Sequence, residues 1–365
     1  MKAATLRERV DKVFKNTPGI NRILLVNTNS QDPNFIYLTD FTSGLFEGSF
    51  LLVTKAGVTL FTYPLEYETA KQQAVRGMRI VNMDSEKKFR LLESEIKGAK
   101  IGVNERFVPY RSYKNLKKRL KPKSIVDVSE AFSKARETKD SEEIKRIREG
   151  ARITKKAVSE MQKRLKAGMT ERELAIEFDS LMLRLGSERP SFPTIVCFGA
   201  NAALPHHMPD NTRLKYGDFV LIDAGAVVKN YASDITRTML FGKDKGRVKE
   251  YGKKLAMLNT VKAAQSKAIS AIKQGAKGGK IHMIAQNIID KADNGTYKGT
   301  FIHALGHSIG IEVHDGYGRF LSPKSSLVLK DGMVTSVEPG IYLPGFGGVR
   351  FEDDVLVTKN GPVIL

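Results

Sequence analysis

The sequence is poor in cysteine and has no long apolar stretch. Cys197 is the only cysteine among 365 residues, so no internal disulfide can form, as expected in a reducing compartment. We read it as a small buried side chain and not as a nucleophile. No run approaches the ~18 apolar residues of a membrane span, and the first ten residues lack the apolar core of a signal peptide. We therefore expect a cytoplasmic protein without a membrane partner.

Several catalytic and nucleotide-binding motifs are also missing. The sequence has no G-x-S-x-G elbow and no C-x-x-C pair. Residues 275–280, GAKGGK, have neither the spacing nor the following Ser or Thr of a phosphate-binding P-loop. These absences exclude the common serine-nucleophile, cysteine-nucleophile and P-loop chemistries.

Acidic residues are outnumbered, 40 against 60 lysines and arginines, which gives a formal charge of +20. A basic balance can indicate nucleic acid, an anionic membrane surface or an acidic partner. The densest basic run, residues 114–123, has no interleaved aromatic residues and fits the solvated face of a helix. We therefore expect no nucleic-acid partner.

The length favours two domains. Residues 1–125 indicate a smaller α/β domain without evident chemistry, because no histidine precedes position 206. This domain would supply shape, subunit pairing or a wall of the substrate pocket. We expect a linker over 126–140 and a second domain over 141–365. The strand-like runs of the first domain are residues 22–26, 35–38, 49–53 and 58–62, and its helix-like run is residues 65–74.

Residues 219–241 place two carboxylates in what should be a β-hairpin. Phe219, Leu221 and Asp223 alternate along one face, Asp234 belongs to the second run, and Lys229 with its neighbouring Asn provides turn chemistry. If Asp223 lies opposite Asp234, the turn centres between residues 228 and 229. Two carboxylates that close repel each other unless a cation or a shared proton lies between them.

Residues 334–357 repeat the arrangement. Glu338 lies on the first run and Glu352 on the second, around a turn whose midpoint is Gly345. Two such hairpins could join into a cluster of four carboxylates. Because these acids alternate with Leu, Ile, Val and Phe, a pair of ordinary surface hairpins does not explain them.

Each hairpin follows a pair of predicted helices, which indicates an internal duplication. Asp140 with Glu143, and Thr170 with Glu173, have the spacing of capping boxes that open the first pair. Aligning residues 165–168 with 272–275 places the second pair 107 positions later. A helix-helix-hairpin repeat explains why the acids come in matched pairs.

One of the histidines is a candidate metal ligand in addition to the four carboxylates. His303 and His307 have H-x-x-x-H spacing, but Gly306 and Gly310 argue against a helix and the Glu of H-E-x-x-H is missing. We therefore interpret His307 as one ligand on an irregular strand, and His282 as an ordinary core residue. Four acids and one imidazole suit a site for two divalent ions, with manganese expected first and cobalt, zinc or iron as alternatives.

The motifs resemble those of the pita-bread metallopeptidases, the group that includes prolidase, aminopeptidase P and methionine aminopeptidase. The resemblance covers about residues 140–365, and the region before it resembles the additional domain of the proline-specific members. It implies an α+β chain, with a pita-bread catalytic domain of internal pseudo-twofold symmetry behind a smaller α/β domain. The segments that carry it are IDAGAVVKNYASDITRT, HALGHSIGIEVHDG, SVEPGIY and GGVRFEDD.

The resemblance also implies roles for individual residues. Asp223 would chelate one ion, Asp234 and Glu352 would bridge both, and His307 and Glu338 would bind the second. Beyond the ligands, His206 would lie near the leaving group, His314 would hold the scissile carbonyl or its oxyanion, and His303 would lie beside the substrate. Arg350 would lie near the substrate carboxylate. His207 has no counterpart.

The expected reaction is hydrolysis by a hydroxide held between the two ions, with Glu338 as proton acceptor and Glu338 or His206 as proton donor to the leaving nitrogen. We expect a homodimeric Xaa-Pro dipeptidase, a prolidase, acting on proline-containing dipeptides. The alternatives are an aminopeptidase P acting on longer peptides and a non-catalytic binding protein that uses the basic surface. Methionine aminopeptidase fits less well because it does not need the first domain.

Overall fold

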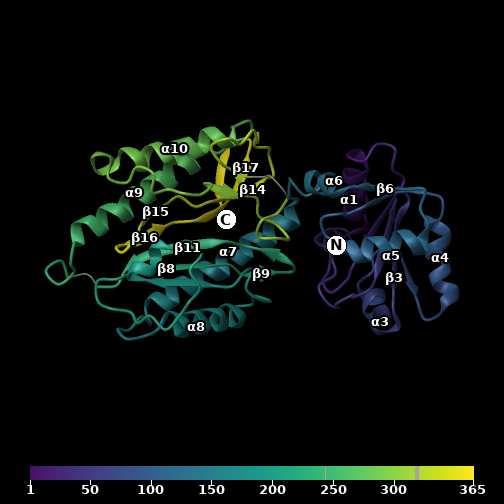
Figure 1. Ribbon diagram of the computed structural model, residues 1–365, viewed down its shortest axis with the longest axis horizontal. Helices are drawn as coiled ribbons and strands as arrows, with labels where there is room; N and C mark the ends of the chain where they lie inside the picture. The colour runs from purple at the N-terminus through teal and green to yellow at the C-terminus, as the bar shows by residue number, and fades with distance from the viewer. Residues whose placement is uncertain (243, 317–319) are drawn as a thin grey trace. The chain divides into compact units, whose positions relative to one another are not determined.

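The computed structural model describes residues 1–242, 244–316 and 320–365, and the chain divides into two compact units, Met1–Glu137 and Thr138–Leu365 (Figure 1). The expected linker, residues 126–140, includes the end of a strand, helix α6 (Ser129–Ala135) and the last residues before helix α7. Within the described ranges, no helix combines the length and apolar content needed to span a membrane.

A six-stranded mixed sheet forms the centre of the N-terminal unit, in the order β4-β3-β2-β1-β5-β6. Apolar strand residues such as Leu24 and Phe61 pack with Leu92 and Leu116 from two covering helices. The strands are β1 Arg22–Val26, β2 Phe50–Thr54, β3 Gly57–Thr62, β4 Met78–Asn82, β5 Lys100–Val103 and β6 Ser124–Asp127. The helices before α6 are α1 Ala3–Lys15, α2 Pro33–Thr39, α3 Pro64–Gln73, α4 Glu86–Ile96 and α5 Tyr110–Leu120.

The prediction of a strand at residues 35–38 is wrong, because these residues belong to helix α2. The Asp32 side chain accepts a hydrogen bond from the Asn34 amide at 2.8 Å, and Pro33 occupies the first helical position. An N-cap acid followed by proline favours a helix start, whereas a four-residue apolar run carries too little periodicity to distinguish strand from helix.

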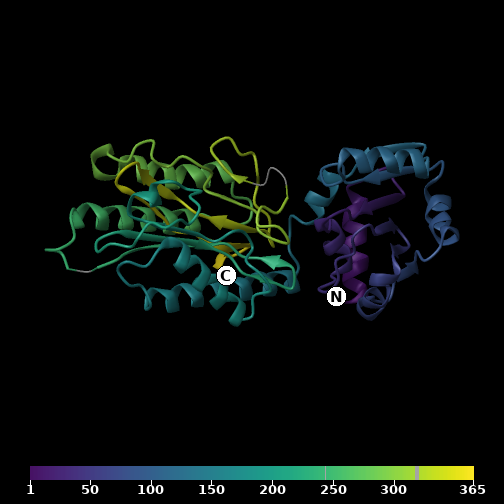
Figure 2. The same cartoon turned by 60° about the horizontal axis from the view of Figure 1, so that its bottom comes forward.

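The C-terminal unit places several small sheets between helices. In both views α9 and α10 lie on one side of the strands and α8 on the other (Figures 1 and 2). The helices are α7 Ser141–Gln162, α8 Glu171–Arg184, α9 Tyr251–Ser270 and α10 Gly278–Lys291, with 3-10 turns at Gly199–Ala203 and Ala292–Gly295. The strands are β7 Ile195–Phe198, β8 Phe219–Ala224, β9 Val227–Val228, β10 Tyr231–Ala232, β11 Ile235–Leu240, β12 Gly306–His307, β13 Phe320–Leu321, β14 Val334–Val337, β15 Gly340–Leu343, β16 Gly347–Arg350, β17 Asp353–Thr358 and β18 Gly361–Ile364.

Strand β8 is buried on both faces. Phe219 and Leu221 belong to the core that includes α9 and α10, whereas Val220 and Ile222 belong to the core formed with α7 and α8. Full burial of such a side chain stabilises the fold by about 1.5–3 kcal/mol. Because side chains alternate along a strand, Asp223 continues the Phe219 and Leu221 face and is carried into the interior.

The first hairpin has a different register from the one considered above. Asp223 pairs with Thr236, not Asp234, and Val228 pairs with Tyr231. The turn therefore centres between Lys229 and Asn230, which both have positive φ, 47° and 68°. Two consecutive left-handed residues make the tight turn that matches the twist of a hairpin, and this turn fixes the register.

The second hairpin has the expected register. Strand β14 pairs with β17 and β15 pairs with β16, with Val337 opposite Asp353 and Gly340 opposite Arg350. Counting between these pairs places Glu338 opposite Glu352, around a turn that contains Gly345 at φ 77°. Both glutamates lie in the short interruptions between the paired strands.

The structure confirms the pseudo-twofold repeat. Both predicted capping boxes are formed in the first helix pair, at Asp140 and at Thr170, whereas α9 and α10 begin without a side-chain cap. Gly168 and Gly275 have φ of 85° and 84°, and their amides donate to the carbonyls of Leu214 and Leu329 respectively. Each of these carbonyls lies nine residues before the first acid of its hairpin, Asp223 or Glu338, so the two halves share this local geometry although their hairpin registers differ.

Candidate metal centre

The two hairpins are hydrogen-bonded to each other where their acids meet. The Glu352 amide donates to the Thr236 carbonyl at 3.1 Å, and the Thr236 hydroxyl donates to Glu352 Oε2 at 2.7 Å. The Asp234 amide donates to Asp354 Oδ2 at 3.0 Å. These bonds bring the segment around Asp234, just before β11, against the segment around Glu352, between β16 and β17.

His307 joins this cluster from β12. Its amide donates to Ser336 Oγ at 3.1 Å, and the Glu338 amide donates to the Leu305 carbonyl at 2.8 Å. The ring Nε2 lies 3.6 Å from Asp234 Oδ2 and 3.4 Å from Glu338 Oε1. Nδ1 lies 3.4 Å from the Ser308 carbonyl, so the tautomer that carries its proton on Nδ1 would donate to that oxygen and turn the Nε2 lone pair toward the acids. The residues around His307 form no helix, as the glycines predicted.

The cluster contains negative charge that the surrounding residues do not balance. Asp223 Oδ1, Asp234 Oδ1 and Glu352 Oε1 are buried and have no hydrogen-bond partner. Burial, and then the charge of neighbouring acids, raises the pKa of Asp234 and of Glu352 well above the usual range. Burial also raises the pKa of Glu338 to about 8 and lowers the pKa of His307 to about 3. A buried arrangement of this kind favours a bound cation.

The donor set fits divalent metal ions. One ligand atom from each of Asp234, His307 and Glu352 lies within 4.8 Å of the others. The unpartnered oxygens of Asp223, Asp234 and Glu352 provide acceptors that have no other use in the described structure. Carboxylate oxygens with a single imidazole and no thiolate favour hard or borderline ions such as manganese, cobalt and iron.

Arg350 occupies the interior of the site. Its Nη2 donates to Asp223 Oδ2 at 2.6 Å, its Nη1 to the Tyr342 hydroxyl at 2.9 Å and its Nε to Thr236 Oγ1 at 3.1 Å. The side chain is only 3% exposed, so the guanidinium faces protein groups here and would have to exchange a partner to reach a substrate carboxylate. Its role in substrate binding stays a prediction.

The other predicted histidines lie in different environments. The His314 ring is 4.2 Å from the His307 ring, and His314 is exposed. His303 Nε2 lies 2.8 Å from the Tyr342 hydroxyl, and burial and then the charge of Arg350 lower its pKa to about 4. His206 is exposed and lies near enough to contribute to the lowered pKa of both His303 and His314. His282 is 1% exposed and stacks on Phe301, as expected of a core residue.

Sequence reasoning missed three residues that hold the acids in place. Thr236 bonds both Glu352 and Arg350, Tyr342 joins Arg350 to His303, and Asp354 fixes the Asp234 amide. Burial raises the pKa of Asp354 to about 8. The alternation of Thr236 with Asp234 was a signal available in the sequence, since both belong to one face of the second run.

A second group of polar residues explains His207. Glu171, fully buried at the start of α8, accepts bonds from the Phe198 amide, Asn201 Nδ2, His207 Nε2 and the Asp210 amide at 2.6–3.2 Å. Asp210, His207 and Glu171 could also hold an ion by their spacing. Because both oxygens of Glu171 are already satisfied, we interpret this group as the support of the loop that carries His206.

Comparisons with known proteins agree with this geometry. Residues 145–359 match the family described as "Metallopeptidase family M24", and residues 19–138 match the "Creatinase/Prolidase N-terminal domain". A protein of Pyrococcus horikoshii named Xaa-Pro dipeptidase is 35% identical over 358 residues, 98% of this chain and 96% of that protein.

Two solved structures have the same fold over nearly the whole chain. The prolidase of Pyrococcus horikoshii has a TM-score of 0.85 and 34% identity, covering 98% of this chain and 97% of that one. The X-Pro aminopeptidase of Thermotoga maritima has a TM-score of 0.84 and 29% identity, covering 98% and 96%. The chain therefore belongs to metallopeptidase family M24, with the pita-bread catalytic fold and the additional N-terminal domain.

Proposed function

We propose that this protein is a metal-dependent Xaa-Pro dipeptidase that hydrolyses the bond between an N-terminal residue and proline. The observation that carries the proposal is the set of three buried carboxylate oxygens without a partner, on Asp223, Asp234 and Glu352, together with the grouping of Asp234 and Glu352 with His307 within 4.8 Å. The full-length similarity to a protein named Xaa-Pro dipeptidase supports the choice of substrate.

We further propose Asp223, Asp234, His307, Glu338 and Glu352 as the ligands of two divalent ions. Asp223 would bind one ion through Oδ1 while Oδ2 keeps its bond to Arg350. Asp234 and Glu352, whose pKa values are raised by burial and then by neighbouring acids, would serve both ions. Two such ions lower the pKa of water toward neutrality and polarise the scissile carbonyl.

The remaining residues would handle protons and orient the substrate. Glu338, whose Oε1 lies 3.4 Å from His307 Nε2, would accept a proton from the attacking water and pass it to the leaving nitrogen. His314, beside His307, would hold the carbonyl oxygen, and His206 would face the leaving group. The pKa of His303, lowered to about 4, keeps this ring neutral at pH 7 beside the substrate.

The second candidate is an aminopeptidase P acting on longer peptides. It is favoured by the equally close fold of the Thermotoga maritima X-Pro aminopeptidase. A dipeptidase must close its pocket behind the proline carboxylate, whereas an aminopeptidase needs room there. The clustered buried acids and His307 argue against a non-catalytic binding protein, which has no need of them.

Initial rates of the chelator-stripped protein on Met-Pro and Met-Pro-Ala test the choice, with manganese, cobalt, zinc or iron added singly. We expect release of proline from Met-Pro, the fastest rate with manganese, and no cleavage of Met-Ala, which controls for proline specificity. Cleavage of Met-Pro-Ala in preference to Met-Pro would indicate the aminopeptidase. Failure on all peptides with every metal would contradict both candidates.

Manganese as the resident ion, a homodimer and a cytoplasmic location also stay proposals. The oxygen-rich donor set supports manganese. The resemblance to proline-specific members of the family supports the dimer, which sedimentation of the purified protein would test. The single buried thiol, Cys197, supports a reducing compartment, which fractionation of source cells would test.

A further inference from the structure

We propose that Lys139 is a positioning residue that holds the loop 308–315 in register, so that His307 and His314 meet the substrate and the ions together. The proposal rests on the function proposed above. The Lys139 ammonium lies 3.1 Å from Asp315 Oδ2 and 3.1 Å from Ser308 Oγ. One cation therefore binds the two residues that directly follow His307 and His314 in the chain.

The loop is closed at its base around this ammonium. The Asp315 amide donates to the Ser308 carbonyl at 2.8 Å, and the Ala232 amide donates to the Gly310 carbonyl at 2.8 Å. Gly310 lies so close to the Asp315 carboxylate that an added Cβ would be 2.3 Å from Oδ2. With both ends fixed, the two histidine rings are held 4.2 Å apart.

Lys139 itself is anchored through its main chain. It directly precedes Asp140, the N-cap of α7, and its amide donates to the Gly332 carbonyl at 2.8 Å. Gly332 directly precedes the segment that enters β14. The Lys139 side chain therefore extends from main chain that is held between the start of α7 and the start of β14. Its ammonium restrains the loop 308–315 from outside that loop.

The energetics favour positioning over stability as the reason for this pair. The Lys139 and Asp315 side chains are 1% and 2% exposed, so both charges lose their hydration on folding. Replacing a buried ion pair with apolar residues is often neutral or stabilising, whereas removing one partner is costly. A buried pair at the base of a loop between two active-site histidines is explained by the geometry it imposes.

The test is the double substitution Lys139→Met with Asp315→Asn, which removes both charges and avoids a buried charge without its counterion. The manganese dissociation constant, measured by calorimetry, reports on His307 without any need for turnover. The kcat and KM on Met-Pro report on His314. We expect manganese affinity to fall about tenfold, the lower end for groups that orient metal ligands, and kcat to fall about tenfold with KM within about twofold.

Met161→Ala is the control for lost stability, because Met161 is a fully buried residue of α7 in the core with α8. The proposal is supported if the double variant changes the manganese affinity or the kcat while Met161→Ala changes neither. If neither readout differs from Met161→Ala, Lys139 is only structural and the proposal is overturned. A wild-type protein that binds manganese but does not cleave Met-Pro would contradict the proposed function alone, since the affinity comparison would still test Lys139.

Discussion

Single hydroxyl and guanidinium contacts decide which oxygens of the site remain for a cation. Thr236 donates to Glu352 Oε2 and accepts from Arg350 Nε, while Arg350 Nη2 occupies one oxygen of Asp223. As a result Glu352 Oε1 and Asp223 Oδ1 are the oxygens without a partner. Each of these two carboxylates is therefore oriented by the hydrogen bond to one of its oxygens, and its other oxygen remains available to a cation.

Thr236→Val tests this orientation. The substitution keeps the shape of the side chain but removes hydrogen bonds to two charged groups, so we expect about 1.5–3 kcal/mol less stability to urea and about 10–100-fold weaker metal binding. Thr238→Val is the matched control, because the Thr238 hydroxyl bonds only the main chain of Arg350, at 2.9 and 3.0 Å. Equal metal affinity in the two variants would contradict the role of Thr236.

At the scale of the element, close approach of backbones brings the ligands together. Gly306 directly precedes His307, and a Cβ added there would lie 1.9 Å from the Ser336 carbonyl oxygen. The amide of His307 bonds the side chain of the same Ser336. Strand β12 therefore reaches β14 only because position 306 has no side chain.

Gly306→Ala should push β12 away from β14 and displace His307. We expect a loss of about 1–3 kcal/mol in the free energy of unfolding, as for other overpacked sites, together with weaker manganese binding. Gly252→Ala on α9 is the control: an added Cβ there meets nothing within 4 Å, and alanine is the better helix former. Thermal unfolding and calorimetric titration of both variants measure the two effects, and an unaltered Gly306→Ala protein would refute the close-approach argument.

The elements around the site were largely predictable from sequence, and their cross-connections were not. The period-two alternation of apolar and polar residues predicted both hairpins, and the midpoint at Gly345 gave the correct partner of Glu338. The register at Asp223 needed the left-handed turn at Lys229 and Asn230, which composition suggests but does not place. Lys139 and Asp315 are 176 positions apart, and a contact of that separation leaves no local periodicity to detect.

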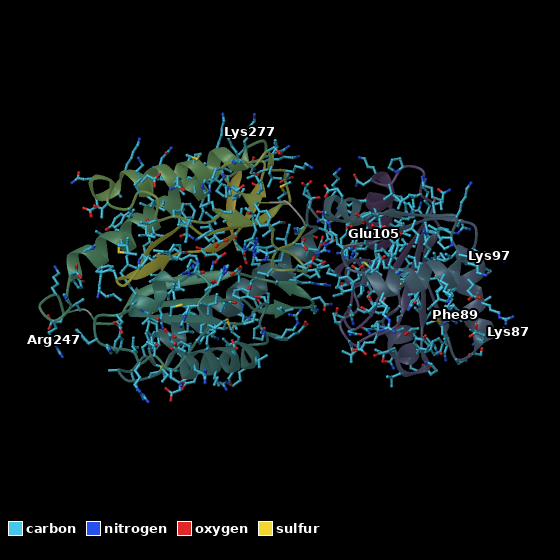
Figure 3. All side chains as sticks on the ribbon, viewed as in Figure 1. Lys87, Phe89, Lys97, Glu105, Arg247 and Lys277 are labelled. Carbon is cyan, nitrogen blue, oxygen red and sulfur yellow. The ribbon has the colours of Figure 1, made fainter. Side chains whose placement is uncertain are left out.

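At the scale of the whole molecule, charge is distributed unevenly between surface and interior. Lysines and arginines such as Lys87, Lys97, Arg247 and Lys277 lie at the outer edges of their units (Figure 3). Asp223, Asp234 and Glu352 of the metal centre are buried instead, and Glu338 is partly buried. The net charge of +20 therefore coexists with a concentrated negative interior, which explains why composition alone did not indicate a cation site.

The buried acids should make the metal-free protein less stable as pH rises from the ordinary carboxyl pKa of about 4 to about 8. The folded state retains protons on Glu338 and Asp354, whose pKa values are raised to about 8, after the unfolded chain has lost them. The free energy of unfolding should then fall by about 1 kcal/mol per pH unit for each carboxyl still protonated. The lowered pKa of His307 acts in the opposite direction, but only below its ordinary value near 6.5.

Urea unfolding of chelator-treated protein at pH 7.0 and 8.5 measures this effect. Glu338→Gln should reduce the pH slope because it removes one of the titrating groups, and bound metal should remove the contribution of Glu338, a proposed ligand, while that of Asp354 remains. Stability that rises between the two pH values in the metal-free protein would show that the acids are ionised without penalty.

The most direct test of the metal centre is the metal content of desalted protein, measured by mass spectrometry after loading with manganese. We predict two ions per chain in the wild-type protein and in Glu149→Gln, which alters an exposed acid of α7 paired with Arg152. Glu352→Gln should hold at most one ion and lose activity on Met-Pro, because the proposed bridging ligand serves both ions. Two ions and full turnover in Glu352→Gln would contradict the assignment of the site.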